Sequence, residues 1–199
     1  MKRLIKIAFA ILLSVLLCSC KGNNHKRIVS EIPIKTELLG LKLGDKVKEA
    51  TLKRALTKAT NKEYYVQSET NGKAHILRAI PFKQYGDGIL YGSMSWHYID
   101  IQTNVDDQIV QICLVSSYES VERAEMHYDK AVNILSMKYG EGNVMNDNTL
   151  TFWTDESNSV GTYFEESSTI RGEDRSFCFL YYVNIELADA AEQENVPDV

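Results

Sequence analysis

The thiol of Cys20 is the side chain in this sequence with the clearest chemistry. A cysteine sulfur is a nucleophile that can be alkylated. The small Ser19 directly precedes Cys20, and the apolar Leu17 lies three residues before it. This spacing suits cleavage of the chain just before Cys20, whereas Cys18 follows two bulky leucines and fits poorly. We therefore expect Cys20 to be the residue that receives a diacylglycerol group.

The first 19 residues have the organisation of a bacterial secretion signal. Basic residues precede an uncharged stretch at positions 7–17. That length suits a signal peptide and falls short of the roughly 20 apolar residues of a membrane-spanning helix. Together with Cys20 the stretch resembles a bacterial lipobox; an ordinary cleaved signal peptide is the alternative. We predict a lipoprotein signal peptide in residues 1–19 and a lipid-anchored, flexible tether in residues 20–36.

The charge of the processed chain restricts its partners. Removal of residues 1–19 takes away three positive charges and changes the formal net charge from −5 to −8. Binding to nucleic acid requires a basic surface that neutralises phosphates. We therefore expect no nucleic-acid partner. An acidic body is also repelled by anionic lipid, so we expect membrane contact to run through the lipid anchor alone.

Two cysteines remain after processing, Cys113 and Cys178, each inside an apolar segment typical of a strand. In an oxidising envelope they can form a disulfide if their strands are neighbours. Otherwise they are two buried free thiols, because free cysteine packs like a small hydrophobic residue. The sequence leaves both alternatives open.

No motif in the sequence indicates catalysis. The histidines lie too far apart for a metal site with ligands one helical turn apart. Gly92 begins a string that lacks the final glycine of a nucleophile elbow. We expect no enzyme activity, no metal and no cofactor, although catalytic triads do assemble from distant positions. The four histidines are His25, His75, His97 and His127.

Aromatic residues supply the candidate binding surface. The chain has 11 tyrosines, and Tyr85 and Tyr91 fall in or beside expected loops and strand ends, close in sequence to Trp96 on an expected strand. Tyrosine gives a large contact area at a small entropic cost, which favours interfaces with a protein or a glycan. The alternative is that the aromatic residues fill the sheet face beneath the helices. A second candidate is an aromatic cleft around Trp96 and Trp153 that binds a small ligand or glycan.

Hydrophobic periodicity predicts the elements that position these residues. Apolar residues at helical spacing predict one helix up to about residue 60 from a cap at Asp45, and a stronger helix from Ser117 or Ser120 to Tyr139. Alternating segments predict strands, with Asn71-Gly72 as a hairpin turn and a long strand pair within 89–103.

The order of these elements is helix, strands, helix, strands. We therefore expect an α+β fold, in which two helix-then-antiparallel-strand units pack their helices on a meandering antiparallel sheet. The expected domain covers residues 37–187 as a single unit. Residues 188–199 are acidic, and we expect a disordered tail there.

Short motifs add a resemblance that covers most of the chain. The string Gly40-Leu41-Lys42-Leu43-Gly44 precedes a predicted helix, and Lys138-Tyr139-Gly140 ends another before a strand with Trp153. With the lipobox, this combination resembles uncharacterised lipoproteins of the Bacteroidota. The element order is also similar to that of the outer-membrane assembly lipoprotein BamE and of β-lactamase-inhibitor-like domains. The resemblance implies a binding or assembly role without catalytic residues.

The residues after Cys20 bear on location. Bacteroidota lipoproteins exported to the cell surface tend to carry acidic residues soon after the lipidated cysteine, but Lys21-Gly22-Asn23-Asn24 follows here. The resemblance therefore implies an outer-membrane anchor with the protein facing the periplasm. Our leading expectation is a non-enzymatic binding or assembly protein of the cell envelope. The alternative is a small-ligand or glycan-binding lipoprotein that serves nutrient capture.

Overall fold

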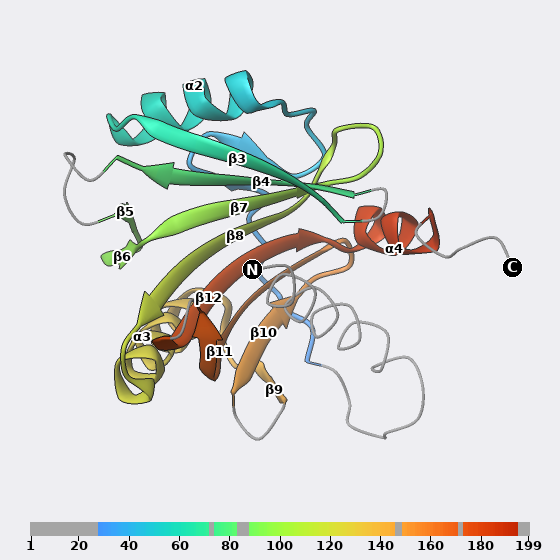
Figure 1. The fold of residues 1–199 in the computed structure, drawn as a ribbon. Coiled ribbons are helices and arrows are strands. Elements are labelled where there is room, and N and C mark those ends of the chain that lie inside the picture. The colour runs from blue at the N-terminus through green and yellow to red at the C-terminus, as the bar shows by residue number, and fades with distance from the viewer. Residues whose placement is uncertain (1–27, 72–73, 83–87, 146–148, 171–172, 195–199) are drawn as a thin grey trace, which may run out of the picture.

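A single antiparallel sheet of eight strands forms the centre of the molecule (Figure 1). The structure is a computed structural model that describes residues 28–71, 74–82, 88–145, 149–170 and 173–194. Neighbouring strands follow the order β3-β4-β7-β8-β12-β11-β10-β9. Their bounds are β3 (Tyr64–Asn71), β4 (Ala74–Pro81), β7 (Tyr98–Thr103), β8 (Ile109–Tyr118), β9 (Asn143–Met145), β10 (Leu150–Thr154), β11 (Asn158–Ile170) and β12 (Glu173–Asn184).

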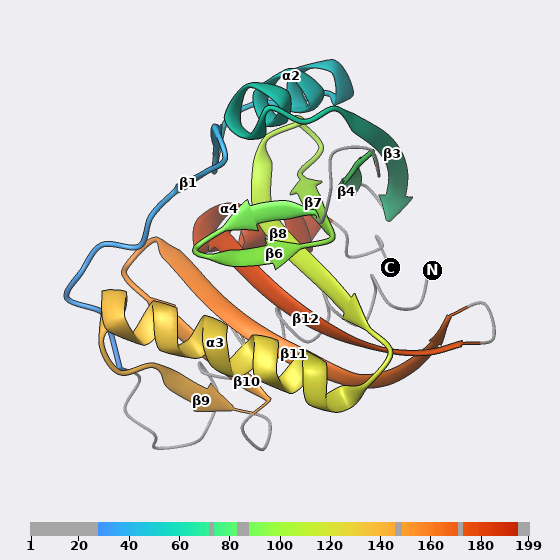
Figure 2. The same ribbon diagram turned by 90° about the vertical axis from the view of Figure 1, so that its left-hand side faces the viewer.

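Helices cover the two faces of this sheet unequally (Figures 1 and 2). α2 (Glu49–Thr60) and α3 (Val121–Tyr139) pack on one face, and α4 (Ile185–Glu194) packs on the other. In α3 the Ser120 hydroxyl accepts a hydrogen bond from the Arg123 backbone N–H at 3.4 Å, which caps the first turn. This helix confirms the predicted element and begins after Ser120, the later of the two predicted starts.

Two small hairpins complete the described elements. β1 (Glu37–Leu38) pairs with β2 (Leu41–Lys42), and β5 (Ile89–Tyr91) pairs with β6 (Met94–Trp96). The β5–β6 turn places Gly92 and Ser93 at φ values of 59° and 60°. Two successive positive φ angles are typical of the tightest hairpin turns. Figure 2 shows this hairpin over the sheet face between α2 and α3.

The core has two layers because strand side chains alternate between the faces of the sheet. The layer under α2 and α3 contains both tryptophans and most of the buried leucines and isoleucines. The layer on the α4 face is rich in aromatic residues, with Tyr163 and Phe179 stacked at a centroid distance of 4.3 Å. Its buried members are Val110, Cys113, Val115, Leu150, Phe152, Tyr163, Phe177, Phe179, Tyr181, Val183, Ala188 and Ala191.

The expected α+β class, with two helix-then-strand units packing helices on a sheet, is wrong. The described helices have 12, 19 and 10 residues, whereas one sheet takes in eight strands of up to 13 residues. The fold is mostly β. Alternation within a strand is a local signal, so it did not show that all eight strands join a single sheet or how long β11 and β12 become.

The expectation of a flexible tether up to residue 36 is wrong for its described part, residues 28–36. The Ser30 N–H donates to the Thr154 carbonyl at 2.8 Å, and the Ile34 N–H donates to Asp155 Oδ2 at 2.6 Å. Ile34 is 3% exposed and belongs to the core. Burial of the apolar Ile34 side chain stabilises the ordered segment. This contribution exceeds the conformational entropy that the segment would keep if it stayed free in water. Residues 1–27, including the predicted signal peptide and Cys20, lie outside the described residues.

The expectation of a disordered tail from residue 188 also needs correction. Residues 185–194 form α4, and the Leu187 N–H donates to Asn184 Oδ1 at 2.9 Å. Ala188 and Ala191 lie one helical turn apart and are 1% and 2% exposed. Two small apolar residues at this spacing bury against the sheet despite the acidic residues around them.

No helix in the described ranges is both long enough and apolar enough to cross a membrane.

Candidate functional site

Three side-chain hydrogen bonds fix the β5–β6 hairpin to the sheet face that α2 and α3 cover. Lys130 Nζ on α3 donates to the Ser93 carbonyl at 2.9 Å. Ser116 Oγ on β8 donates to the Ser95 carbonyl at 3.2 Å. Lys62, just after α2, donates to the Gly88 carbonyl. The hairpin is therefore held on a rigid support and does not hang free as a loop.

At the open end of the hairpin, the backbone at Gly88 packs closely against the backbone at Trp96. Gly88 has a φ of +74°, and a Cβ at this position would overlap the carbonyl of Trp96. Ile89 and Trp96 are paired in register and are both 0% exposed. Leu90 lies between Ile89 and Tyr91 and is 69% exposed. The hairpin thus buries one side in the core and presents the other to solvent.

A small apolar pocket lies between this hairpin and α3. Its volume is about 70 Å³. The Tyr91 and Tyr182 hydroxyls are 3.0 Å apart and hydrogen-bonded to each other. This bond leaves the lining almost wholly apolar. The residues that line the pocket are Tyr91, Gly92, Met94, Ala131, Ile134, Leu135, Lys138, Leu180 and Tyr182.

The size and lining of this pocket decide what it can hold. Sites for small-molecule ligands typically measure about 300–1,000 Å³. A pocket of about 70 Å³ suits a single aliphatic side chain instead. Lys138 at its rim is exposed, and its ammonium lies 4.7 Å from the centroid of the Tyr139 ring. The pocket is therefore built for apolar contact beside one positive charge.

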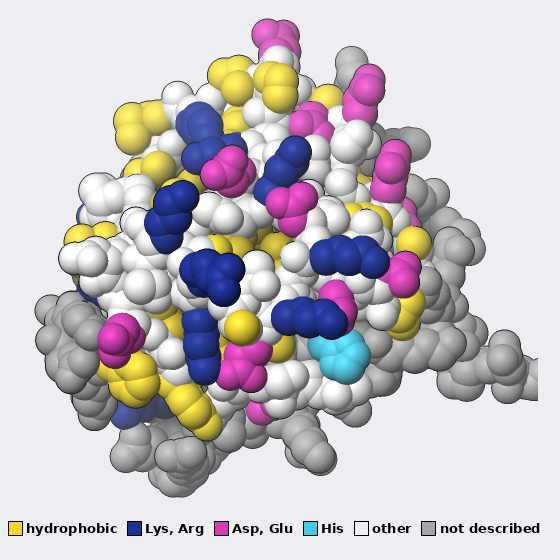
Figure 3. Space-filling view, turned by 90° about the horizontal axis from the view of Figure 1, so that it is seen from above, with side chains coloured by type: hydrophobic (Ala, Val, Ile, Leu, Met, Phe, Trp, Pro, Cys, Tyr) yellow, Lys and Arg dark blue, Asp and Glu magenta, His cyan; other side chains and the backbone are white. Residues whose placement is uncertain are grey.

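The surface above α2 shows no comparable grouping of one kind of side chain. On the face drawn in Figure 3, basic and acidic side chains are interspersed and yellow apolar atoms are scattered among them. Two of these side chains, Lys53 and Glu49 on α2, form an ion pair with an N–O distance of 2.8 Å.

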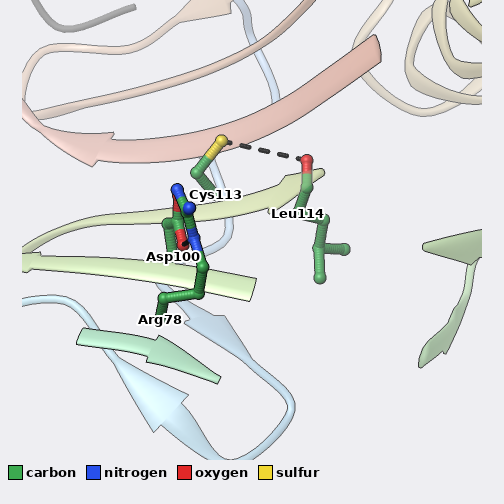
Figure 4. Close-up of polar contacts among 4 residues, drawn as sticks. All are labelled: Arg78, Asp100, Cys113 and Leu114. Atoms are coloured by element: carbon green, nitrogen blue, oxygen red, sulfur yellow. Dashed lines mark hydrogen bonds and ion pairs between the residues drawn. The ribbon is translucent and has the colours of Figure 1, made fainter. Parts of the chain in front are cut away.

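The opposite face of the sheet holds a buried ion pair (Figure 4). Arg78 on β4 donates to both carboxylate oxygens of Asp100 on β7, at 2.7 Å from Nε and 2.6 Å from Nη2. The two side chains are only 13% and 18% exposed. The Arg78 guanidinium also lies 4.5 Å from the centroid of the Tyr98 ring. Burial opposes the charge of Arg78, but the Asp100 carboxylate outweighs it and raises the Arg78 pKa.

Cys113 lies next to this ion pair across the sheet. The register places Cys113 on β8 directly opposite Asp100, and its Sγ lies 3.8 Å from the Leu114 carbonyl (Figure 4). Burial raises the pKa of the Cys113 thiol well above its usual value. The reactive form of cysteine is the thiolate. A thiol with a raised pKa is a poor nucleophile.

A third group of polar residues surrounds His127 on α3. The Tyr118 hydroxyl is 2.7 Å from His127 Nδ1, and the Trp96 ring meets the imidazole edge-on at a centroid distance of 4.6 Å. Burial, with smaller effects of His97 and Lys130, lowers the pKa of His127 to about 4. His127 is therefore neutral at physiological pH. Within the described residues, no group of three or more His, Cys, Asp or Glu side chains is arranged to hold a metal ion.

The structure places two of the three residues of the predicted binding surface, Tyr91 and Trp96, in different environments on the same hairpin. Tyr91 lines the pocket. Trp96 is 0% exposed and has no surface to offer, because the hairpin turns its ring into the core against His127. Tyr85 lies outside the described residues. The predicted aromatic cleft is also wrong, since Trp153 is 1% exposed and donates its indole N–H to the Gly140 carbonyl at 2.8 Å.

Cys113 and Cys178 are both free and buried, so the disulfide alternative is wrong. Strands β8 and β12 are neighbours, but the register pairs Cys113 with Tyr181 and Cys178 with Ser116. The two cysteines are thus offset by three residues, and an odd offset places them on opposite faces of the sheet. Cys178 belongs to the layer under α3, and Cys113 belongs to the α4 layer.

Sequence reasoning missed Arg78 and Asp100, although a signal was present. Each is a single charged residue inside a strand whose neighbours are mostly apolar. Charged residues are rarely buried unless they are paired. Sequence reasoning also missed the pocket residues Ile134 and Tyr182, which no local pattern sets apart from the rest of the core.

Comparisons of this chain with protein-family models, with curated proteins and with solved structures each returned no match. The resemblance to Bacteroidota lipoproteins, to BamE and to β-lactamase-inhibitor-like domains therefore stays a prediction.

Proposed function

We propose that this chain is a non-enzymatic lipoprotein of the cell envelope that binds or assembles with another envelope protein. Cys20 carries the lipid, and the domain faces the periplasm from the outer membrane. The lipobox-like sequence at Leu17–Cys20 supports the lipid anchor, and the lack of acidic residues in Lys21-Gly22-Asn23-Asn24 supports the periplasmic orientation. The observation that carries the binding role is the apolar pocket between the β5–β6 hairpin and α3.

The pocket supports recognition of an aliphatic side chain on the partner. Burying a Val, Leu or Ile side chain contributes roughly 1.5–3 kcal/mol. The exposed Leu90 on the same hairpin adds apolar area outside the pocket. Such a side chain would act as the anchor of a wider interface, because stable protein complexes bury about 800 Å² on each partner.

The glycan-binding alternative loses its structural basis. It depended on Trp96 and Trp153 lining a cleft, and both side chains are buried in the core. Sugar rings stack on exposed aromatic faces, and neither indole offers one.

The first test is crosslinked co-purification of the tagged protein from native membranes. The native protein should recover one dominant partner, and Ile134→Trp should reduce that recovery at least about tenfold by filling the pocket. Met126→Trp is the matched control, because Met126 lies on the same helix, is 70% exposed and does not line the pocket.

Three further results complete this test. Thermal unfolding of both variants should match that of the native protein, so that any loss reflects binding. Cys20→Ala should abolish membrane retention and the recovery of the partner. Equal recovery with Ile134→Trp would rule out the pocket, and failure of the native protein to recover a partner would contradict the binding role.

A further inference from the structure

Four aliphatic side chains are exposed on the first described residues and on the neighbouring strand β9. Ile28, Val29 and Ile32 are 39%, 56% and 48% exposed, and Val144 on β9 is 55% exposed. The Asn143 side chain bonds to both the N–H and the carbonyl of Ile28, each at 2.8 Å. These bonds hold Ile28 beside β9. We call Ile28, Val29, Ile32 and Val144 the aliphatic corner.

The aliphatic corner cannot easily collapse into the core. Ser30 is fixed to Thr154 by its backbone N–H, and its hydroxyl donates to the Ile32 carbonyl at 2.8 Å. Ile34 is buried just beyond. The backbone is thus anchored on both sides of the exposed residues. Exposed apolar groups that gather in one place mark a surface that meets something other than water.

The position of the proposed lipid anchor identifies the occupant of this surface. Cys20 lies eight residues before Ile28. Eight extended residues span at most about 28 Å, so the aliphatic corner cannot move farther than that from the acyl chains. Lys26 and Arg27 lie within this connection and are attracted by anionic headgroups. One acidic residue, Glu31, is exposed at the corner and opposes that attraction.

We propose that the aliphatic corner rests on the outer-membrane bilayer and inserts its side chains into the interfacial region, in contrast to the expectation from net charge that membrane contact runs through the lipid anchor alone. This proposal depends on the proposed lipid anchor at Cys20. The sheet domain then has a defined orientation on the membrane. In Figure 2 the β5–β6 hairpin lies away from β9, with α3 between them, so the pocket stays accessible to a partner.

The test uses the full lipidated chain in vesicles of neutral phosphatidylcholine, with and without anionic phosphatidylglycerol. Nitroxide labels are placed at Val29→Cys, Val144→Cys and the control Leu90→Cys, which is on the exposed side of the hairpin. The native Cys113 and Cys178 are buried and stay unlabelled in the folded protein. Spin relaxation then reports collisions of each label with oxygen, which concentrates in lipid, and with a water-soluble nickel chelate.

In neutral vesicles, the ratio of oxygen to nickel collisions at positions 29 and 144 should exceed that at position 90 by at least about threefold. Equal ratios at the three positions would overturn the proposal. Elevated ratios only in anionic vesicles would also overturn it, because the basic residues before Ile28 would then be responsible. Spin coupling between labels at position 29 of two molecules would assign the corner to a second copy of the chain.

Mass spectrometry of Cys20 separates the two proposals. An unmodified Cys20 refutes the anchor and with it the proposed function. A lipidated Cys20 combined with water-exposed labels at positions 29 and 144 leaves the anchor intact and overturns only the membrane contact of the corner.

Discussion

At the scale of single residues, the structure keeps several polar groups neutral or paired within an apolar interior. The bidentate hydrogen bond between Arg78 and Asp100 pairs a positive charge on β4 with a negative charge on the neighbouring β7. Such a buried pair does little for net stability, but removing one partner would leave the other charge unpaired. His127 instead avoids the problem by remaining neutral, since burial lowers its pKa to about 4.

The lowered pKa of His127 predicts a dependence of stability on pH. An unfolded histidine has a pKa near 6.5, so between pH 6.5 and about 4 the unfolded chain binds a proton that the folded chain does not. The free energy of unfolding should therefore fall as the pH is lowered through this window. The full pKa shift of His127 corresponds to roughly 3 kcal/mol of unfolding free energy. Because the ring is partly exposed, we expect a change of about 1 kcal/mol.

Urea unfolding at a series of pH values measures this effect. His127→Gln should flatten the slope between pH 6.5 and 4, whereas His75→Gln, a change on β4 far from α3, should keep it. An unchanged slope in His127→Gln would show that another group titrates.

At the scale of elements, β12 organises the sheet because it pairs with β8 on one side and β11 on the other. Gly161 on β11 lies directly opposite Tyr181 on β12. A Cβ at position 161 would overlap the Tyr181 hydroxyl. The missing side chain of Gly161 thus provides the space in which the Tyr181 ring lies over the sheet.

Gly161→Ala should therefore destabilise the protein by about 1–3 kcal/mol through overpacking. Tyr181→Leu in the same background removes the clashing hydroxyl and should recover part of the loss. Chemical denaturation of the two single variants and the double variant gives the coupling energy. Simple additivity of the two changes would mean that the predicted clash does not exist.

At the scale of the whole molecule, residues 28–36 belong to the folded body and not to a linker. Ile34 is 3% exposed, and the Lys35 N–H donates to the Tyr139 hydroxyl at 3.3 Å, which connects this segment to the end of α3. The chain thus closes the far edge of the sheet before it enters β1. The predicted flexible tether is therefore wrong over residues 28–36.

Ile34→Ala should lower the free energy of unfolding by about 2–4 kcal/mol, because it leaves a cavity in the core. Val29→Ala, in the same segment but 56% exposed, should change it by less than about 0.5 kcal/mol in the unlipidated protein. Thermal or urea unfolding of both variants measures the contrast. If neither substitution changed the free energy of unfolding, the result would support the prediction of a flexible tether.

Local patterns in the sequence determined the elements whose bonds are themselves local. The stripe of α3 and the two strands β3 and β4 appear where periodicity predicted them, although Asn71, predicted as a turn residue, belongs to β3 and pairs with Ala74. The start of α2 differs, because the Asp45 carbonyl accepts a hydrogen bond from the Ile109 N–H at 2.9 Å and the helix begins only at Glu49. A contact with a distant strand here outweighed a local capping signal.

Only the tertiary structure decided which side chains meet. Strand register placed Cys113 and Cys178 on opposite faces, and the folding back of β5–β6 buried Trp96 while leaving Tyr91 at a pocket. A strand pattern states that side chains alternate, but it does not state which strand lies alongside or in which register. Those choices depend on the burial of the whole sheet under α2, α3 and α4, and therefore on contacts between residues far apart in the sequence.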